Sequence, residues 1–538
     1  MTSLATASAD WIAHDPDPQT AAELAACSPE ELDRRFSHPL TFGTAGLRGP
    51  LRGGPDAMNL AVVMRATWAV AQVLKDRGSG ETHVVVGRDA RHKSDEFALA
   101  AAEVLAGEGF DVLLMLAAVP TPVIAYAVRH LPTAAGIQIT ASHNPPTDNG
   151  YKVFLGGGMQ IIPPVDREIE AAMARAPHAD EIPRVPVEVG GLRQIHGYVE
   201  RAARVRRSAG PVRVALTPLH GVGGEYALDA MALAGFDDVH VVEEQFAPDP
   251  DFPTVGFPNP EEPGAVDALL ALADDIDAEI AIALDPDADR CAVGVPGPDG
   301  WRMLTGDETG WLLGDYILSQ LEPGPVSEAA LVASTVVSSR MLAAIAEAHG
   351  AQHAETLTGF KWLARAQSPG NTLVYAYEEA IGHCVDPAAV RDKDGISTAI
   401  LAADLVAALR DQGRTMLDAL DDLAKKHGVH VTGAVARHVD DADAAMARLR
   451  SDPPTELAGI AVTAEDLQQR PGQLCTDALI FTGDDAGTSV RVVVRPSGTE
   501  PKLKSYTEVR CSPSDDVSTA RAHAEKLSQA LADAAARW

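Results

Sequence analysis

Four short segments of this 538-residue chain carry side chains whose types and spacing suit phosphate chemistry. In the first, Thr140–Pro146 (TASHNPP), a serine follows an apolar run. The others are Asp285–Arg290 (DPDADR), Glu378–His383 (EEAIGH) and Arg495–Pro501 (RPSGTEP). Together they offer a nucleophilic hydroxyl, a carboxylate cluster, a polar sugar-recognition loop and an anion trap. This combination predicts a phosphoryl-transfer enzyme that acts on phosphorylated sugars.

Ser142 is the candidate nucleophile. A serine hydroxyl is weakly nucleophilic at pH 7, and no G-x-S-x-G elbow surrounds this one, which disfavours acyl transfer. His143 is adjacent in sequence, which is poor geometry for a base acting on Ser142. A phosphoserine is the better hypothesis, since its charge of about −1.5 to −2 needs a metal or arginine partner. Taken alone, the segment is more typical of a turn with Asx-type hydrogen bonds.

Asp285, Asp287 and Asp289 alternate along the chain, so an extended backbone would place all three carboxylates on one side. Three converging carboxylates repel one another unless a hard cation such as Mg²⁺ lies between them. An EF-hand is excluded, because Arg290 stands at its sixth position and Pro296 at its twelfth. A solvated acidic turn is the alternative, which the preceding apolar run 280–284 disfavours.

The last segment predicts a phosphate clamp formed by Arg495, Ser497, Gly498 and Thr499, because a guanidinium, hydroxyls and backbone amides all bind phosphate oxygens. Glu378, Glu379 and His383 are candidates for binding sugar hydroxyls, and Gly359 and Lys361 mark a second candidate loop. Each of these segments, taken alone, is equally compatible with a polar turn or surface loop. Lys393 lies between carboxylates, a pattern typical of a salt-bridged turn.

Composition excludes several function classes. The net charge of −32 disfavours nucleic acid and anionic membranes as partners. No P-loop or G-x-G-x-x-G pattern supports a nucleoside triphosphate or NAD enzyme. Five scattered cysteines, the lack of a signal-peptide pattern and the proline-interrupted apolar run 112–128 predict a cytoplasmic protein.

Most of the chain alternates β-rich runs, Gly- or Asp-rich turns and Ala/Leu-rich helical stretches, which predicts parallel, doubly wound α/β layers. Loops that follow the carboxyl ends of such strands form the site. We expect strands at 83–87, 110–116, 135–140, 212–216, 278–284 and 330–337. One helix is expected at 95–107, and another should follow the strand at 330–337 and end at 348. Beyond about Lys426 we expect a separate α+β domain with strands at 478–481 and 489–494 and a helix from Asp516. Linkers are expected near 198–210 and 321–325.

The ordered motifs FGTAGLRG, TASHNP, DPDADR, GFKW, EEAIGH, RDKDG and RPSGTEPK resemble the α-D-phosphohexomutases, the phosphoglucomutase and phosphomannomutase family. The resemblance spans nearly the whole chain and is greatest to the branch with phosphoglucomutase 2 and phosphopentomutase. It implies three tandem doubly wound α/β domains plus a smaller C-terminal α+β domain around a central cleft. The expected divisions are 1–205 with the phosphoserine loop, 206–322 with the metal loop, 323–430 with the sugar loop and 431–538 with the phosphate loop.

The resemblance also implies roles for the matching residues. Ser142 would be the phosphoserine and would hold Mg²⁺ together with Asp285, Asp287 and Asp289. Arg48, His143 and Lys152 match positions near the transferring phosphoryl group, and Lys393 matches a lysine proposed in proton transfer. The remaining substrate-binding candidates are Arg290, Gly359, Lys361, Glu378, Glu379, His383, Arg495, Ser497, Gly498 and Thr499.

The implied reaction interconverts sugar 1- and 6-phosphates of glucose or mannose through a sugar 1,6-bisphosphate. A phosphopentomutase, a sugar-bisphosphate synthase and an inactive sugar-phosphate sensor are the alternatives. Many relatives have a serine where this chain reads Glu379-Ala380-Ile381, so one hydroxyl contact is missing and the sugar is left open. The sequence also leaves open the oligomeric state and whether His143, Lys152 or Lys393 is the general base.

Overall fold

The computed structural model describes residues 4–42, 46–78, 80–497 and 502–538. The chain divides into two compact units, and each contains two large sheets. Unit 1 comprises the described residues up to Arg302 together with Gly382–Asp404. Unit 2 comprises Met303–Ile381 and Leu405–Trp538. The chain therefore leaves unit 1 and later returns to it.

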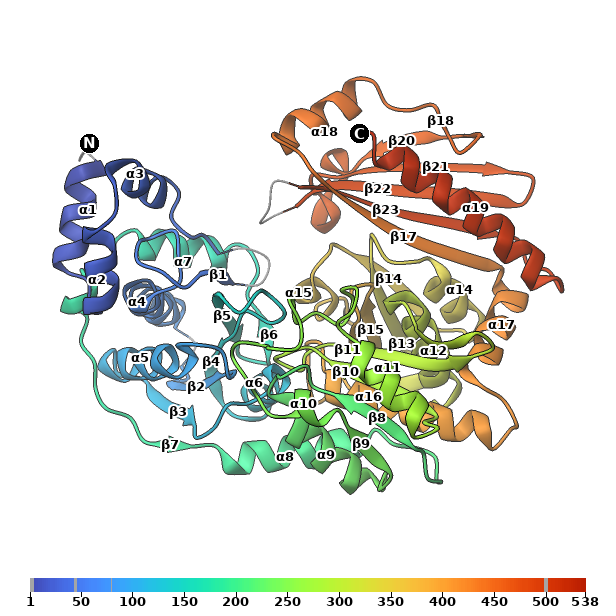
Figure 1. Ribbon diagram of the computed structural model, residues 1–538, viewed down its shortest axis with the longest axis horizontal. Coiled ribbons are helices and arrows are strands. Elements are labelled where there is room, and N and C mark those ends of the chain that lie inside the picture. The colour runs from blue at the N-terminus through green and yellow to red at the C-terminus, as the bar shows by residue number, and fades with distance from the viewer. Residues whose placement is uncertain (1–3, 43–45, 79, 498–501) are drawn as a thin grey trace. The chain divides into compact units, whose positions relative to one another are not determined.

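The first sheet of unit 1 has the strand order β1-β5-β4-β2-β3-β7, with β6 paired to β5. β4, β2, β3 and β7 run parallel, whereas β1 and β5 are antiparallel to their neighbours. All residues of β4 are buried, and α5 and α6 both pack against β2 (Figure 1). The strands are β1 (Leu47–Pro50), β2 (His83–Arg88), β3 (Asp111–Met115), β4 (Thr133–Ile139), β5 (Asp148–Leu155), β6 (Met159–Gln160) and β7 (Val189–Gly190).

The long helix α4 (Leu60–Arg77) begins and ends at capping residues of the sequence. It starts at the Asn59 side chain, which accepts a hydrogen bond from the Val62 amide, and ends at Gly78 in the left-handed region. The other helices are α1 (Leu4–Ala13), α2 (Pro18–Ala25), α3 (Pro29–Ser37), α5 (Ser94–Gly107), α6 (Thr121–His130), α7 (Val165–Met173) and α8 (Leu192–Ala203).

The second sheet of unit 1 has the order β12-β11-β10-β8-β9. Its central strand β10 (Ile280–Leu284) is fully buried, parallel to β8 and antiparallel to β11. The segment Asp285–Arg290 connects β10 to β11, so its carboxylates lie at the carboxyl end of a buried strand. The other elements are β8 (Val214–Thr217), β9 (Val239–Val241), β11 (Cys291–Gly297), β12 (Gly300–Met303), α9 (Gly223–Ala234), α10 (Glu243–Phe246) and α11 (Asp267–Asp275). The segment Gly382–Asp404 contributes β16 (Gly382–Cys384), which is not part of this sheet, and the first part of α16 (Gly395–Arg410).

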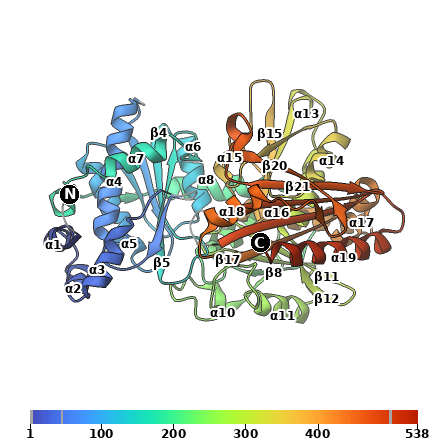
Figure 2. The same cartoon turned by 90° about the horizontal axis from the view of Figure 1, so that it is seen from above.

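Unit 2 combines a parallel sheet, β14-β13-β15, with an antiparallel sheet of order β17-β23-β22-β21-β20. α19 packs along β17 and β23 of the antiparallel sheet (Figure 2). The bounds are β13 (Ala330–Thr335), β14 (Gln352–Thr356), β15 (Thr372–Glu378), β17 (Val429–His438), β20 (Thr463–Asp466), β21 (Leu479–Asp485), β22 (Thr488–Pro496) and β23 (Lys502–Cys511), with β18 (Glu456–Leu457) and β19 (Ile460–Ala461) as a separate pair. The helices are α12 (Gly306–Ser319), α13 (Pro325–Glu328), α14 (Met341–Ala348), α15 (Phe360–Leu363), α17 (Met416–His427), α18 (Ala442–Ser451) and α19 (Val517–Ala535).

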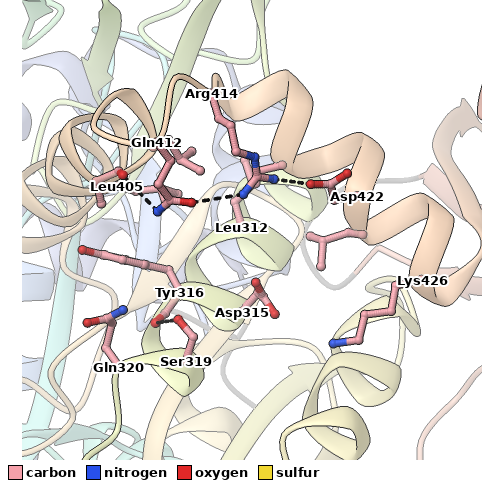
Figure 3. A pocket seen from close by; sticks show the side chains of 14 residues that line it. Leu312, Asp315, Tyr316, Ser319, Gln320, Leu405, Gln412, Arg414, Asp422 and Lys426 are labelled. Carbon is pink, nitrogen blue, oxygen red and sulfur yellow. Dashed lines mark hydrogen bonds and ion pairs between the residues drawn. The ribbon is translucent and has the colours of Figure 1, made fainter.

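Unit 2 also contains a pocket of about 300 Å³ lined by α12, α17 and the chain from Leu405 onwards (Figure 3). An ion pair between Arg414 and Asp422 lies at this pocket, and Lys426 lines it as well. None of the site residues expected from the sequence lines it.

The α/β prediction is confirmed, and every expected strand has a counterpart within a few residues. The linker predicted near 198–210 is wrong in its first part, because α8 continues to Ala203 and buries Tyr198. Of the arginines that made this segment look solvated, only Arg201 lies within α8, and its guanidinium pairs with Asp386 at 2.6 Å. All five cysteines are free thiols. Across the described residues, no helix has the length and apolar character required to span a bilayer.

Unit 2 should lose stability as the pH falls, through His353 on β14. Burial lowers the pKa of this imidazole to about 4, and its Nε2 lies 2.9 Å from the Ser334 hydroxyl. The unfolded chain binds a proton near pH 6.5 and the folded chain only near pH 4, so stability is lost as the pH falls through this window, by up to about 3 kcal/mol.

We expect calorimetry to show that His353→Gln flattens the fall of the unfolding midpoint between pH 7 and pH 4.5. His523→Gln, on the exposed face of α19, is the control and should follow the wild type. An unaltered pH profile in His353→Gln would show that another group dominates acid destabilisation.

Candidate active site

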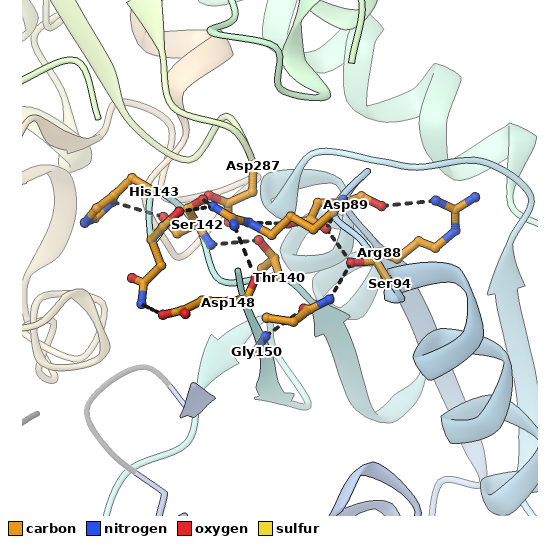
Figure 4. Close-up of polar contacts among 12 residues, drawn as sticks. Arg88, Asp89, Ser94, Thr140, Ser142, His143, Asp148, Gly150 and Asp287 are labelled. Atoms are coloured by element: carbon orange, nitrogen blue, oxygen red, sulfur yellow. Dashed lines mark hydrogen bonds and ion pairs between the residues drawn. The ribbon is translucent and has the colours of Figure 1, made fainter. Parts of the chain in front are cut away.

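Ser142 follows β4 in a buried turn and is 1% exposed. Its backbone φ of +53° lies in the left-handed region, and its amide donates a 2.9 Å hydrogen bond to Thr140 Oγ1. Its hydroxyl donates to Asp285 Oδ2 at 2.8 Å. The same hydroxyl lies 3.3 Å from His143 Nδ1 (Figure 4). A non-glycine residue held at positive φ at such a site indicates a backbone fixed by its surroundings.

His143 lies within hydrogen-bonding distance of the serine hydroxyl, although adjacency in sequence argued for poor geometry. Burial, together with the positive charges of Arg290 and Arg48, holds the pKa of His143 well below its ordinary value, so the imidazole is neutral at pH 7. Arg48 on β1 donates to Asn144 Oδ1 at 3.3 Å and so reaches the same loop. The structure thus brings Arg48, Ser142 and His143 together.

Asp285, Asp287 and Asp289 converge, with one oxygen of each lying within 4.8 Å of the others, and all three are fully buried. The expected extended backbone is wrong. The segment is a turn in which the Ala288 amide donates to Asp285 O at 2.8 Å and Ala288 takes a φ of +53°. A turn that holds the aspartates this way gathers the carboxylates more tightly than alternation along a strand.

Lys152 on β5 contacts two of these carboxylates. Its Nζ donates to Asp287 Oδ2 at 2.7 Å and to Asp289 Oδ2 at 2.8 Å. Burial alone would raise the pKa of Asp287, but the Lys152 ammonium, its hydrogen bond and the Thr121 hydroxyl lower it instead. Burial and the two neighbouring carboxylates raise the pKa of Asp285 well above its ordinary value.

The oxygens that face away from Lys152 fit a hard cation. Asp287 Oδ1 and Asp289 Oδ1 are buried and accept no hydrogen bond from any described residue. Buried carboxylate oxygens without a donor are costly unless a cation binds them. With Ser142 hydrogen-bonded to Asp285, the oxygen-only ligand set is the kind that Mg²⁺ prefers.

Lys393 contacts the same Asp289 oxygen as Lys152, with Nζ 3.3 Å from Asp289 Oδ2 and 3.6 Å from Asp392 Oδ1. Its loop is fixed by long-range hydrogen bonds. Gln160 donates to Asp392 at 2.6 Å, and the Tyr198 hydroxyl donates to Asp394 at 2.6 Å. A loop held on both sides of Lys393 keeps that ammonium in a defined place.

Two further candidates belong to unit 1. Arg290 Nε lies 3.8 Å from Asp289 Oδ1, and its backbone amide donates to Asp285 Oδ1 at 2.9 Å. His383 is buried, and burial lowers its pKa to about 3, so it is neutral at pH 7. Its carbonyl accepts the Asp394 amide at 2.8 Å, which links it to the Lys393 loop.

The sugar-recognition candidates of unit 2 lie around the ends of β13 and β15. Glu379 Oε2 accepts hydrogen bonds from Thr335 Oγ1 at 3.0 Å and from Ser338 Oγ at 2.9 Å. Gly306 packs against the backbone of Glu379, and a Cβ at position 306 would lie 1.9 Å from Glu379 O. Glu378 and Lys361 are buried, and Gly359 caps α15 with a φ of +107°.

The phosphate-clamp candidates lie at the end of β22 and directly after it. The Arg495 guanidinium donates to the Tyr506 hydroxyl at 3.2 Å and lies 5.7 Å from the centre of that ring. The Ser497 amide donates to Lys502 O at 2.8 Å. Gly498 and Thr499 lie outside the described residues.

Sequence reasoning missed three groups that contact these loops: Arg91, Asp89 and Thr121. Thr121 begins α6 and reaches Asp287 through both its hydroxyl and its amide, the latter at 2.9 Å from Asp287 O. Its position at a helix start, directly before Pro122, was a usable signal. Arg91 and Asp89 lie in the turn between β2 and α5, a segment that sequence reasoning did not single out as functional.

The chain is similar to known proteins along most of its length. The four domain models of phosphoglucomutase/phosphomannomutase match in order, the α/β/α domains I, II and III at residues 39–180, 196–297 and 305–427 and the C-terminal domain at 446–525. A Haemophilus influenzae protein named "Probable phosphomannomutase" is 41% identical over 464 residues, covering 84% of this chain and 93% of that protein. The Mus musculus phosphopentomutase is 34% identical over 561 residues, covering 94% of this chain and 90% of that protein.

A solved structure shares the fold. A crystal structure of a phosphoglucomutase/phosphomannomutase family protein from Burkholderia thailandensis superposes with a TM-score of 0.70 at 22% identity, covering 92% of this chain and 97% of that one. Members of this family are isomerases that move a phosphate within a sugar phosphate. With all four domains matched in order and relatives above 30% identity along most of its length, the chain belongs to the phosphoglucomutase/phosphomannomutase family of phosphosugar mutases.

Proposed function

We propose that this mutase interconverts the 1- and 6-phosphates of a hexose, glucose or mannose, through a phosphoserine at Ser142 and a sugar bisphosphate. The observation that carries the proposal is the 2.8 Å hydrogen bond from the buried Ser142 hydroxyl to Asp285, within a triad of converging carboxylates. The 41% identity to the Haemophilus protein supports the hexose assignment.

In the proposed cycle, phosphorylated Ser142 donates its phosphoryl group to the free hydroxyl of a sugar monophosphate. The O–P bond to serine breaks as the bond to the sugar oxygen forms, and the sugar hydroxyl gives up its proton. After the bisphosphate turns around, its other phosphoryl group is transferred to the Ser142 oxygen and that sugar oxygen is protonated. Arg48 and Arg290 supply positive charge, and most of the catalysis is positioning and charge stabilisation.

We assign the metal ligands to Asp285, Asp287, Asp289 and the Ser142 oxygen, with Mg²⁺ as the ion. Bound there, Mg²⁺ would neutralise the charge of the transferring phosphoryl group. The oxygens without donors on Asp287 and Asp289 support this assignment.

Proton transfer is assigned to His143 or Lys393. Burial alone would lower the pKa of Lys152, but Asp287 and Asp289 raise it, so Lys152 remains a cation and cannot take a proton. We assign substrate binding to Gly359, Lys361, Glu378, Glu379 and His383 for the sugar and to the Arg495–Thr499 loop for the non-reacting phosphate. The division into four domains at 205, 322 and 430 remains part of this proposal.

A pentose phosphate is the second candidate, because the mouse phosphopentomutase matches 94% of the chain. ³¹P NMR of the protein with Mg²⁺ and catalytic glucose 1,6-bisphosphate would decide. Glucose, mannose and ribose 1-phosphates are supplied together at equal concentration. Growth of a hexose 6-phosphate signal supports the proposal, growth of ribose 5-phosphate alone assigns the pentose, and three unchanged 1-phosphates reject the mutase.

Arg495→Met should raise the KM for sugar monophosphates by roughly 10- to 100-fold, since a charged donor to phosphate contributes about 1.5–3 kcal/mol. kcat should change less, because the non-reacting phosphate is bound in both ground and transition states. Initial rates over a range of substrate concentration measure both constants. Tyr506→Phe removes the hydroxyl that accepts from Arg495 but keeps the ring beneath the guanidinium, so it should raise KM less than Arg495→Met. A fall in kcat at constant KM would place Arg495 at the reacting phosphate instead.

A further inference from the structure

Arg91 lies in the turn after β2, and its guanidinium binds the backbone of the Ser142 loop. One terminal nitrogen donates to Ser142 O at 2.7 Å and Asn144 O at 2.5 Å. The other donates to Pro145 O at 2.7 Å and Asp148 O at 3.2 Å. A single side chain therefore donates hydrogen bonds to four backbone carbonyls within seven residues of one loop.

The guanidinium is itself held from two further sides. Its Nε lies 3.5 Å from Asp89 Oδ2, and its Cζ lies 4.9 Å from the centre of the Phe252 ring. Asp89 Oδ1 in turn accepts the Arg91 amide at 3.0 Å and the Ser94 hydroxyl at 2.6 Å (Figure 4). Arg91 is 4% exposed, so these contacts are made in the interior, where water cannot replace them.

The geometry of this cluster suits arginine alone. Guanidinium offers a planar fork of donors in fixed directions, whereas a lysine ammonium is a compact point charge with three donors. The loop it binds includes Ser142 at a φ of +53°, a conformation that a serine adopts only when neighbouring contacts enforce it. The Asn149 side chain adds a second attachment by donating to His92 O at 2.9 Å and Ser94 Oγ at 3.0 Å.

We propose that Arg91 is the positioning residue for phosphoryl transfer, holding the Ser142 backbone so that the serine oxygen faces the Asp285 carboxylate. Its guanidinium hydrogen-bonds to backbone carbonyls of the loop rather than to the serine hydroxyl or a triad carboxylate, so it acts through the loop. The inference rests on the proposed role of Ser142 and adds the group that fixes its geometry.

Arg91→Lys is the test variant, and Arg88→Lys is the matched control. Arg88 ends the same strand and donates to Asp89 O at 3.1 Å without reaching the loop. We expect Arg91→Lys to lower kcat by about 10- to 100-fold, as a displaced reacting group does, with KM within about twofold of the wild type. Amide hydrogen exchange between residues 142 and 148 should accelerate in Arg91→Lys and remain at the wild-type rate in Arg88→Lys.

Arg91→Ala supplies a second readout. Removal of the side chain leaves space for a free guanidinium ion, and millimolar guanidinium should restore part of kcat, whereas ethylammonium should not. If Arg91→Ala does not fold, the lysine variant alone decides.

A merely structural role would lower the folded fraction while the folded protein kept the wild-type kcat and exchange rates, and that result would overturn the proposal. So would a loss of kcat with unchanged exchange in the loop. Absence of mutase activity in the wild type would reject the proposed function instead, and the exchange comparison would still test whether Arg91 fixes the loop.

Discussion

Ser142→Ala is expected to abolish mutase turnover, by at least about 1,000-fold, because the oxygen that accepts and returns the phosphoryl group is gone. The fold should remain near normal. The variant loses one hydrogen bond to Asp285, about 1 kcal/mol, and alanine meets the same positive φ that serine already occupies. The coupled 1-phosphate to 6-phosphate assay measures turnover, and circular dichroism checks the fold.

Thr147→Ala is the control for this experiment, because its hydroxyl lies in the same loop but is exposed. Intact-mass spectrometry after incubation with glucose 1,6-bisphosphate should show one phosphate on the wild type and on Thr147→Ala, and none on Ser142→Ala. Full activity in purified Ser142→Ala would sink the phosphoserine mechanism.

Removal of divalent metal should have an effect of similar size. Chelation by EDTA is expected to stop turnover and excess Mg²⁺ to restore it, since three buried carboxylates and a phosphate cannot approach one another without a compensating cation. Asp287→Asn keeps the shape of the side chain but removes a ligand charge, and should lower turnover by about 100-fold or more.

Calorimetric titration with Mn²⁺ gives a readout independent of turnover. The wild type should bind one ion, Asp287→Asn should bind it far more weakly, and Asp299→Asn, an exposed carboxylate outside the triad, should behave as wild type. Wild-type activity in EDTA would show that Lys152 alone supplies the charge that the triad requires.

The site was predictable to the extent that each motif is local. The short segments that contain Ser142, the three aspartates and Arg495 indicate their chemistry through their residue types. The strands that carry these segments were predicted from apolar runs bounded by turns. Contacts between distant segments were not predictable. Nothing near Asp392 or Asp394 indicates that Gln160 and Tyr198 will bind them.

Local backbone conformation was the second feature that the sequence did not predict. Ala288 at φ +53° and Ile381 at φ +50° adopt a conformation that their side chains disfavour, isoleucine most of all because it is β-branched. Propensity assigns both to ordinary strand or turn, whereas tertiary packing imposes the strained form. Such strain is concentrated at functional sites, where sequence rules are expected to fail.

The return of the chain into unit 1 has a consequence for its synthesis. Gly382–Asp404 carries Lys393 and the Asp394 partner of Tyr198, and its synthesis is completed 102 residues after Arg302 (404 − 302). At about 5–20 residues per second, a nascent chain holds an incomplete unit 1 for roughly 5 to 20 s. During that interval the Asp289 carboxylate lacks one of its two ammonium neighbours and the Tyr198 hydroxyl lacks its acceptor. A gene fragment that stops at Arg302 therefore encodes the nucleophile and the carboxylate triad without the loop that completes their surroundings.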